Sequence, residues 1–189
     1  MTFRWLEAVS DEKFKPTKSL GDIIPAVRPK FEALINHATA MGMKPKIRSA
    51  GRTCTEQNEQ KKLGHSQAST CRSLHTIGRA IDLDLYPNDC STYTKLGQWW
   101  ESQGGFWGGR WTQFGACGDA GHFHYMPGNQ AVPTSICPAD VTLSECIQIR
   151  NDYLTREFAK RPGGFLKKVG LVALTGAAIF YGAKRFYRG

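Results

Sequence analysis

An aspartate inside a strongly apolar run restricts the fold of this 189-residue chain more than any other feature. The run AIDLDL (80–85) has the composition of a buried β-strand, and His75 lies seven residues before Asp82. A buried, unpaired carboxylate carries a large desolvation cost, which a divalent cation compensates directly. Catalytic zinc commonly takes three His or carboxylate ligands and keeps one position open. The pattern therefore predicts that His75 and Asp82 are two ligands of a metal ion.

The third ligand is expected on a neighbouring strand. The segment GHFHYM (121–126) offers His122 and His124, and a spacing of two residues places both side chains on one face of a strand. Either histidine would complete a three-ligand site with His75 and Asp82.

The remaining patterns predict an α+β fold. Apolar residues at helical spacing predict a first helix over 20–38, and further helices are expected over 55–64 and 93–103. Short strands are expected within 44–52, 80–85 and 121–126. Because strands and helices do not alternate regularly, we predict one domain over 1–150 with packed helices and a small antiparallel sheet. Residues 151–168, which end in KRPGGFLKK, are predicted to be a connector.

The C-terminal segment has the character of a membrane anchor. Residues 169–183, VGLVALTGAAIFYGA, contain no charged residue, and basic residues flank them out to 189. Fifteen residues span only about 22 Å as a helix, so a transmembrane helix here needs its basic flanks to snorkel. Small residues recur every four positions, which would allow homo-oligomers to form through the anchor. The alternative is a buried C-terminal helix.

Charge and cysteine content limit the possible partners and compartment. Of the formal net charge of +9, seven positive charges lie in 160–188, which leaves +2 for 1–159 and argues against nucleic-acid binding. Six cysteines without a C-x-x-C pair predict disulfides in an oxidising compartment, with buried free thiols as the alternative. Fifteen pairings are possible, and closeness in sequence alone suggests Cys137 with Cys146.

Four segments, in order, resemble the zinc D-alanyl-D-alanine carboxypeptidases and L-alanyl-D-glutamate endopeptidases, including phage endolysins of the VanY type. They are SAGRTCTEQ (49–57), Ser73-x-His75-x-x-Gly78-x-Ala80-x-Asp82, WGGRWTQF (107–114) and Asp119-x-x-His122-Phe123. The resemblance covers about residues 20–126. It implies the fold that these peptidases share with Hedgehog signalling domains.

The resemblance also implies roles for individual residues. Zinc would be held by His75, Asp82 and His122. Asp119 would be the general base that takes a proton from the attacking water and later delivers it to the departing amine. Arg52 would hold the carbonyl oxygen as negative charge develops on it, and the alternative for this residue is a surface salt bridge.

Three further residues have open assignments. Ser73 either contacts the substrate or orients His75 through a hydrogen bond. Trp107 is predicted to bind substrate, whereas most of the neighbouring aromatic residues are expected in the core. His124 stands where the family usually has Glu or Gln. In a related murein endopeptidase type with a His-x-His pair, the second histidine binds zinc and the first assists the water, so His124 is the alternative ligand and His122 the alternative base.

These features together predict a zinc-dependent hydrolase of an amide bond in the peptide stem of bacterial peptidoglycan. Since the N-terminus has no signal peptide and the C-terminus has an anchor, we expect a phage or viral lysin. It would be anchored in a virion membrane or in the host cell envelope, facing the periplasm or the wall. The alternative is a non-catalytic, zinc-containing module that binds cell wall or builds the virion, because the Hedgehog domains carry a similar zinc site.

Overall fold

Four short antiparallel strands form one sheet in the computed structural model, which describes residues 13–128 and 132–160. The strands, in the spatial order β1-β2-β4-β3, are β1 Lys46–Ser49, β2 Ala80–Asp84, β4 His122–His124 and β3 Phe106–Trp107. The α-helices are α1 Arg28–Ala40, α2 Cys54–Lys62, α3 Cys90–Ser102 and α4 Leu143–Ala159. Single-turn helices are η1 Leu20–Asp22, η2 Gly108–Arg110 and η3 Thr112–Phe114. The predicted α+β fold with a small antiparallel sheet is confirmed.

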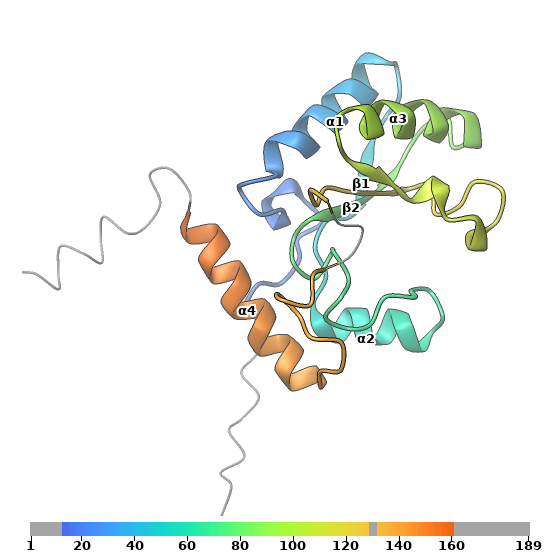
Figure 1. Cartoon of the computed structure of the whole chain (residues 1–189). Helices are drawn as coiled ribbons and strands as arrows, with labels where there is room; N and C mark the ends of the chain where they lie inside the picture. The colour runs from blue at the N-terminus through green and yellow to red at the C-terminus, as the bar shows by residue number, and fades with distance from the viewer. Residues whose placement is uncertain (1–12, 129–131, 161–189) are drawn as a thin grey trace, which may run out of the picture.

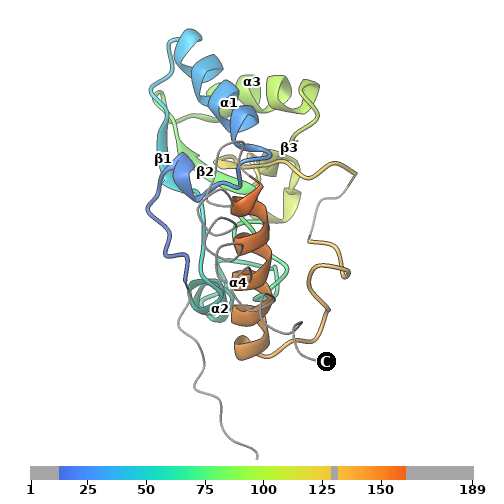
Figure 2. The same cartoon turned by 90° about the vertical axis from the view of Figure 1, so that its left-hand side faces the viewer.

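The helices form two groups around the sheet. Helices α1 and α3 lie side by side above it in Figure 1, and α2 and α4 lie together below it, as Figure 2 also shows. Side chains alternate along β2, so Ile81 and Leu83 are buried in the core while Asp82 projects from the opposite face. The sheet thus has one apolar face and one face that carries ionisable side chains.

The first helix begins later than predicted. The apolar stripe runs from residue 20, but α1 starts at Arg28, and the fully buried Ile23 and Ile24 precede it in non-helical chain. Pro25 accounts for the difference, because a proline disfavours helical backbone in the residue before it. Because Ile24 is not helical, its amide can bond outside the helix, and it donates to the Gly78 carbonyl at 3.1 Å. Gly78 has φ +65°, and a Cβ there would lie 2.8 Å from the Asp22 carbonyl oxygen.

The chain after residue 142 is more ordered than a connector. A capping box between Thr142 and Glu145 starts α4, which continues to Ala159, through the region where the sequence suggests a connector from residue 151. Tyr153 and Leu154 are buried, and the Tyr153 hydroxyl accepts a hydrogen bond from Arg79 Nε at 3.0 Å. In the sequence, the buried residues of α4 recur at helical spacing among charged ones. This is why residues 151–159 resemble a polar linker when the sequence is considered alone.

The rest of the expected connector and the expected membrane helix at 169–183 lie outside the described residues. Among residues 13–128 and 132–160, none of the helices has the length and apolar character that crossing a bilayer requires.

Three disulfides join the described cysteines, as the sequence predicts, but the suggested pair Cys137–Cys146 is wrong. The observed pairs are Cys54–Cys146, Cys71–Cys137 and Cys90–Cys117. Closeness in sequence misleads here because the segment from 137 to 146 packs across two separate parts of the domain. One bond ties α4 to the start of α2, and another ties the chain before α4 to the loop that carries His75.

We expect the bond between α2 and α4 to stabilise the domain more than the bond Cys90–Cys117 does. Cys54 and Cys146 are 92 residues apart, against 27 for Cys90 and Cys117. In the chain-entropy model, loss of the longer loop costs about 4.5 kcal/mol and loss of the shorter about 3.5 kcal/mol. Urea denaturation of the two double serine variants should therefore show the larger fall in the free energy of unfolding for the 54/146 variant. An equal or reversed order would contradict this ranking.

Candidate metal centre

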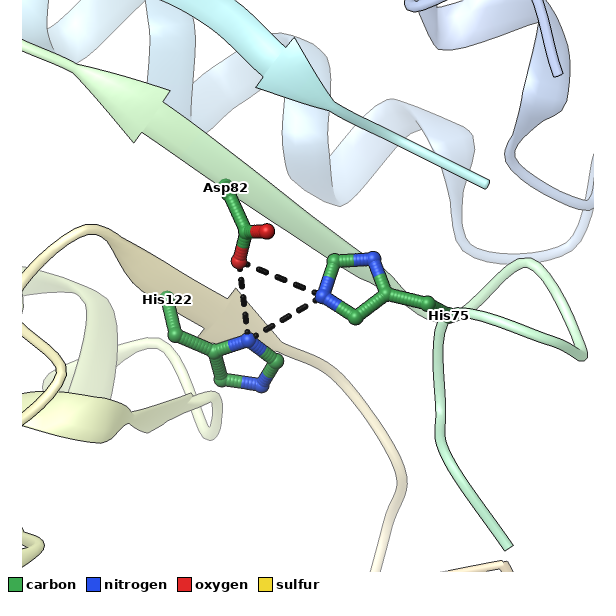
Figure 3. A group of neighbouring side chains, drawn as sticks. All are labelled: His75, Asp82 and His122. Carbon is green, nitrogen blue, oxygen red and sulfur yellow. Dashed lines mark hydrogen bonds and ion pairs between the residues drawn. The ribbon is translucent and has the colours of Figure 1, made fainter. Parts of the chain in front are cut away.

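Three buried side chains from different parts of the chain converge on one point. His75 Nε2 lies 3.2 Å from Asp82 Oδ1, His122 Nδ1 lies 3.1 Å from the same oxygen, and the two nitrogens are 3.2 Å apart. Figure 3 shows the three side chains pointing toward one another from β2, β4 and the loop before β2. The structure thus brings together the three residues predicted to be zinc ligands.

Local structure holds each of these residues in place. In the antiparallel pairing of β2 with β4, Asp82 is the direct partner of His122, so both side chains leave the same face of the sheet. His75 lies in a turn of the preceding loop, where its carbonyl accepts hydrogen bonds from the amides of Gly78 and Arg52, each at 3.2 Å. The Thr76 hydroxyl closes the turn by donating to the Ser73 carbonyl at 2.6 Å.

The electrostatic environment favours the ligating forms of these groups. Burial alone would raise the pKa of Asp82, but the positive character and hydrogen bonds of His75 and His122 outweigh it and hold this pKa well below its usual value. Burial lowers the pKa of His75, although Asp82 opposes the shift. An ionised carboxylate beside a neutral imidazole is the combination that binds a divalent metal.

The spacing of the three ligand atoms fits a tetrahedral zinc site. Zinc–ligand distances of about 2.0–2.1 Å at tetrahedral angles place neighbouring ligand atoms roughly 3.3–3.4 Å apart. The observed separations of 3.1–3.2 Å are close to this. Hydrogen bonds among the three atoms explain the cluster less well, because one pair consists of two imidazole nitrogens, which form a hydrogen bond only when one of them carries a proton and the other does not.

The two predicted catalytic residues line the same cleft as this cluster. Arg52 Nη2 is 3.5 Å from Asp82 Oδ2, and its Nη1 donates to Gln57 Oε1 at 2.6 Å. Asp119 is half-buried and lines the same cleft. Its backbone is held by hydrogen bonds from its own amide to Gly108 and from the His122 amide to its carbonyl, at 2.9 and 3.0 Å.

Gly108 shows why this region requires a residue without a side chain. A Cβ at this position would lie 2.5 Å from the Asp119 carbonyl oxygen and 2.9 Å from the His122 Cβ. The turn that carries Asp119 can therefore approach β4 closely only because residue 108 is glycine. In this way the WGGRW segment contributes to the site through its backbone.

His124 lies next to the cluster but outside it. Its Nδ1 is 3.1 Å from His122 Nε2, the ring nitrogen that faces away from Asp82. Burial, with a smaller contribution from His122 and His75, lowers the pKa of His124 to about 3, so its imidazole is neutral. Among the residues that the structure describes, only His75, Asp82 and His122 form a metal-capable group. The geometry thus favours His122 over His124 as the ligand.

Of the two residues predicted to contact substrate, Ser73 lines the cleft and Trp107 does not. Ser73 is buried and lines the cleft, but His75 Nδ1 has no hydrogen-bond partner within 13–128 and 132–160, so the structure does not show Ser73 orienting it. Trp107 is 5% exposed, its indole donates to the Ala120 carbonyl at 2.8 Å, and it is absent from the cleft lining. Trp107 belongs to the core because residues 97 and 109 are glycines: a Cβ at either position would lie 2.1 Å from the Trp107 ring.

Other residues supply the surface that Trp107 was expected to provide. The cleft has a volume of about 890 Å³, and Trp111 and Phe114 line it. The Trp111 ring centroid is 4.9 Å from that of His122. Sequence reasoning missed Phe114 and the cleft residue Arg72. Phe114 is the last residue of the WGGRWTQF segment, and Arg72 directly precedes the Ser73-x-His75 segment.

Comparison with known proteins gives one family match and one structural likeness. Residues 66–125 match the family model described as D-alanyl-D-alanine carboxypeptidase. Among solved structures, the crystal structure of Serratia marcescens L-Ala D-Glu endopeptidase ChiX aligns with a TM-score of 0.46 and 19% sequence identity, over 57% of this chain and 83% of that chain. A comparison with curated proteins finds no match.

The described α+β domain thus carries a metal-capable His-Asp-His group in a cleft of about 890 Å³. The match over 66–125 includes all three residues of that group, and it confirms the resemblance found in the sequence. The match supports a peptidase, and the likeness to the D-alanyl-D-alanine carboxypeptidase family is limited to residues 66–125 of the 189.

Proposed function

We propose that the chain is a zinc-dependent peptidase that hydrolyses an amide bond in the peptide stem of bacterial peptidoglycan. The observation that carries this proposal is the convergence of His75 Nε2, Asp82 Oδ1 and His122 Nδ1, at 3.1–3.2 Å, in a cleft of about 890 Å³. The family match over 66–125 supports the substrate class.

The metal and its ligands have distinct tasks. When bound, a zinc ion supplies Lewis acidity, which lowers the pKa of water and polarises the carbonyl of the scissile amide. His75, Asp82 and His122 would hold it, and the single carboxylate among them leaves a net positive charge at the site. All three residues line the cleft, so a metal held by them would be accessible to substrate there.

Asp119 and Arg52 handle the proton and the developing charge. Asp119 takes a proton from the attacking water as the water oxygen bonds to the carbonyl carbon, and it gives that proton to the amine nitrogen as the carbon–nitrogen bond breaks. Arg52 donates to the carbonyl oxygen while that oxygen carries negative charge. The bond to Gln57 holds the Arg52 guanidinium at the edge of the cleft before substrate arrives.

Digestion of purified sacculi tests the proposal. Mass spectrometry of the released material should show soluble muropeptides with new amine and carboxyl termini, and these termini identify the bond that is cut. Tight binding to sacculi with no new termini would instead indicate a non-catalytic wall-binding module.

We further propose that residues 169–183 tether the enzyme to a membrane, in a virion or in the host envelope facing the wall, and that the tether allows self-association. The uncharged composition of this stretch and its basic flanks support the proposal. Such a location fits a phage or viral lysin. The full chain should float with lipid vesicles in a density gradient and a variant ending at residue 168 should not. Equal flotation of the two would refute the tether.

A further inference from the structure

The cleft around the candidate metal centre carries more positive than negative side chains. Its carboxylates are Glu56, Asp82 and Asp119, and two of these are already engaged. Asp82 contacts the two histidines, and Glu56 accepts the Thr53 amide at 2.8 Å in the capping box of α2. The cationic side chains that line the cleft are Lys18, Arg48, Arg52 and Arg72.

Arg72 differs from the other two arginines. Arg52 contacts Gln57 and Asp82, and Arg48 pairs with Asp84 at 3.7 Å. The guanidinium of Arg72 makes no hydrogen bond or ion pair with any residue in 13–128 or 132–160, although Arg72 is partly buried. A guanidinium has five donors and loses hydration when it is partly buried, so it gains most from a carboxylate that accepts two hydrogen bonds.

The backbone around Arg72 is held in place. Cys71 is buried and bonded to Cys137, and Ser73 is buried on the other side. The Arg72 amide donates to the Ser69 carbonyl at 2.9 Å. Arg72 therefore stands on a held loop three residues before His75, and it lines the same cleft as the three candidate metal ligands.

We propose that Arg72 binds a free carboxylate of the substrate and selects peptides in which that carboxylate is not amidated. The inference rests on the proposed function and deepens it, because it specifies an anionic peptide substrate. The carboxylate is either that of a glutamyl residue in the stem or the one at the peptide terminus. Both present the same planar pair of oxygens, so the experiment has to separate them.

Kinetics with synthetic stem peptides separate the two sources. One peptide carries both carboxylates, a second has the glutamyl carboxylate as a carboxamide, and a third has the terminal carboxylate as a carboxamide. We expect Arg72→Gln to raise KM for the first peptide about 10- to 100-fold with little change in kcat. One of the two amidated peptides should be cleaved equally by wild type and Arg72→Gln, and it identifies the bound carboxylate. Arg72→Lys should fall between, because lysine keeps the charge but loses the planar pair of donors.

Lys95→Gln is the matched control, since Lys95 is an exposed cation on α3 outside the cleft lining, and it should leave all three KM values unchanged. Calorimetric titration of the peptides into zinc-loaded Asp119→Asn protein measures binding without turnover. Suppose that binding depends on the carboxylate and that Arg72→Gln weakens it, but that wild type cleaves none of the peptides. That result would refute the proposed function and leave the Arg72 assignment standing. Cleavage by wild type with the same Arg72→Gln effect on every peptide would refute the assignment alone.

Discussion

Replacement of His75 by alanine is expected to abolish both metal binding and hydrolysis. His75 is 3% exposed, and its Nε2 is one of only three ligand atoms in the metal-capable group of the described residues. With two ligands left, the site no longer holds zinc at tetrahedral geometry. Loss of the several kcal/mol that a Lewis acid contributes to the transition state should lower kcat/KM by about 10³-fold or more. Metal content per chain and cleavage of sacculi are the two measurements.

His37→Ala is the control for this variant. His37 lies on α1, away from the cleft, where its ring stacks on Trp99 with centroids 4.0 Å apart. It should keep one metal per chain and full hydrolysis. Treatment of the wild type with a chelator should reproduce the His75→Ala loss and also lower the melting temperature, because a metal that binds only the folded chain stabilises it. Added zinc should reverse both effects. Undiminished hydrolysis by metal-free wild type would contradict a metal-dependent mechanism.

Sequence reasoning could find the ligands on the two strands because their placement follows one short-range rule, the alternation of side chains along a strand. Alternation along a strand separates Asp82 from Ile81 and Leu83, and it places His122 and His124 on one face. What the periodicity left open was the choice between the two histidines. That choice depends on the pairing register, in which Asp82 faces His122 and Ala80 faces His124, and a register is a property of two strands together.

Features that depend on long-range packing were not accessible in the same way. The disulfide Cys54–Cys146 spans 92 residues, and the six cysteines allow fifteen pairings that local patterns do not distinguish. Trp107 and Trp111 occur in one motif, yet the first is core and the second lines the cleft. The difference arises because Gly97 and Gly109 accommodate the Trp107 ring, and only the tertiary structure brings these glycines together.

Asp119→Asn is expected to separate metal binding from turnover. Asparagine has nearly the same shape as aspartate, and the turn at 119 is held by backbone hydrogen bonds to Gly108 and from His122, so the metal ligands should stay in place. An amide cannot accept the proton of the attacking water. The loss of general base catalysis should therefore lower kcat by about 10²- to 10⁴-fold while zinc content stays at the wild-type level.

The matched control is Asp140→Asn, an exposed aspartate outside the cleft, which should leave both zinc content and kcat unchanged. If Asp119→Asn kept the wild-type kcat, Asp119 would not be the general base. That role would then belong to a histidine of β4, as in the His-x-His type. In that event His124→Gln should strip the metal and His122→Gln should keep it. The present geometry predicts the reverse for the metal, because His122 Nδ1 and not His124 lies within 3.1–3.2 Å of both His75 Nε2 and Asp82 Oδ1. Zinc content of the two histidine variants thus identifies the histidine that holds the metal, and kcat of Asp119→Asn tests whether Asp119 moves the proton.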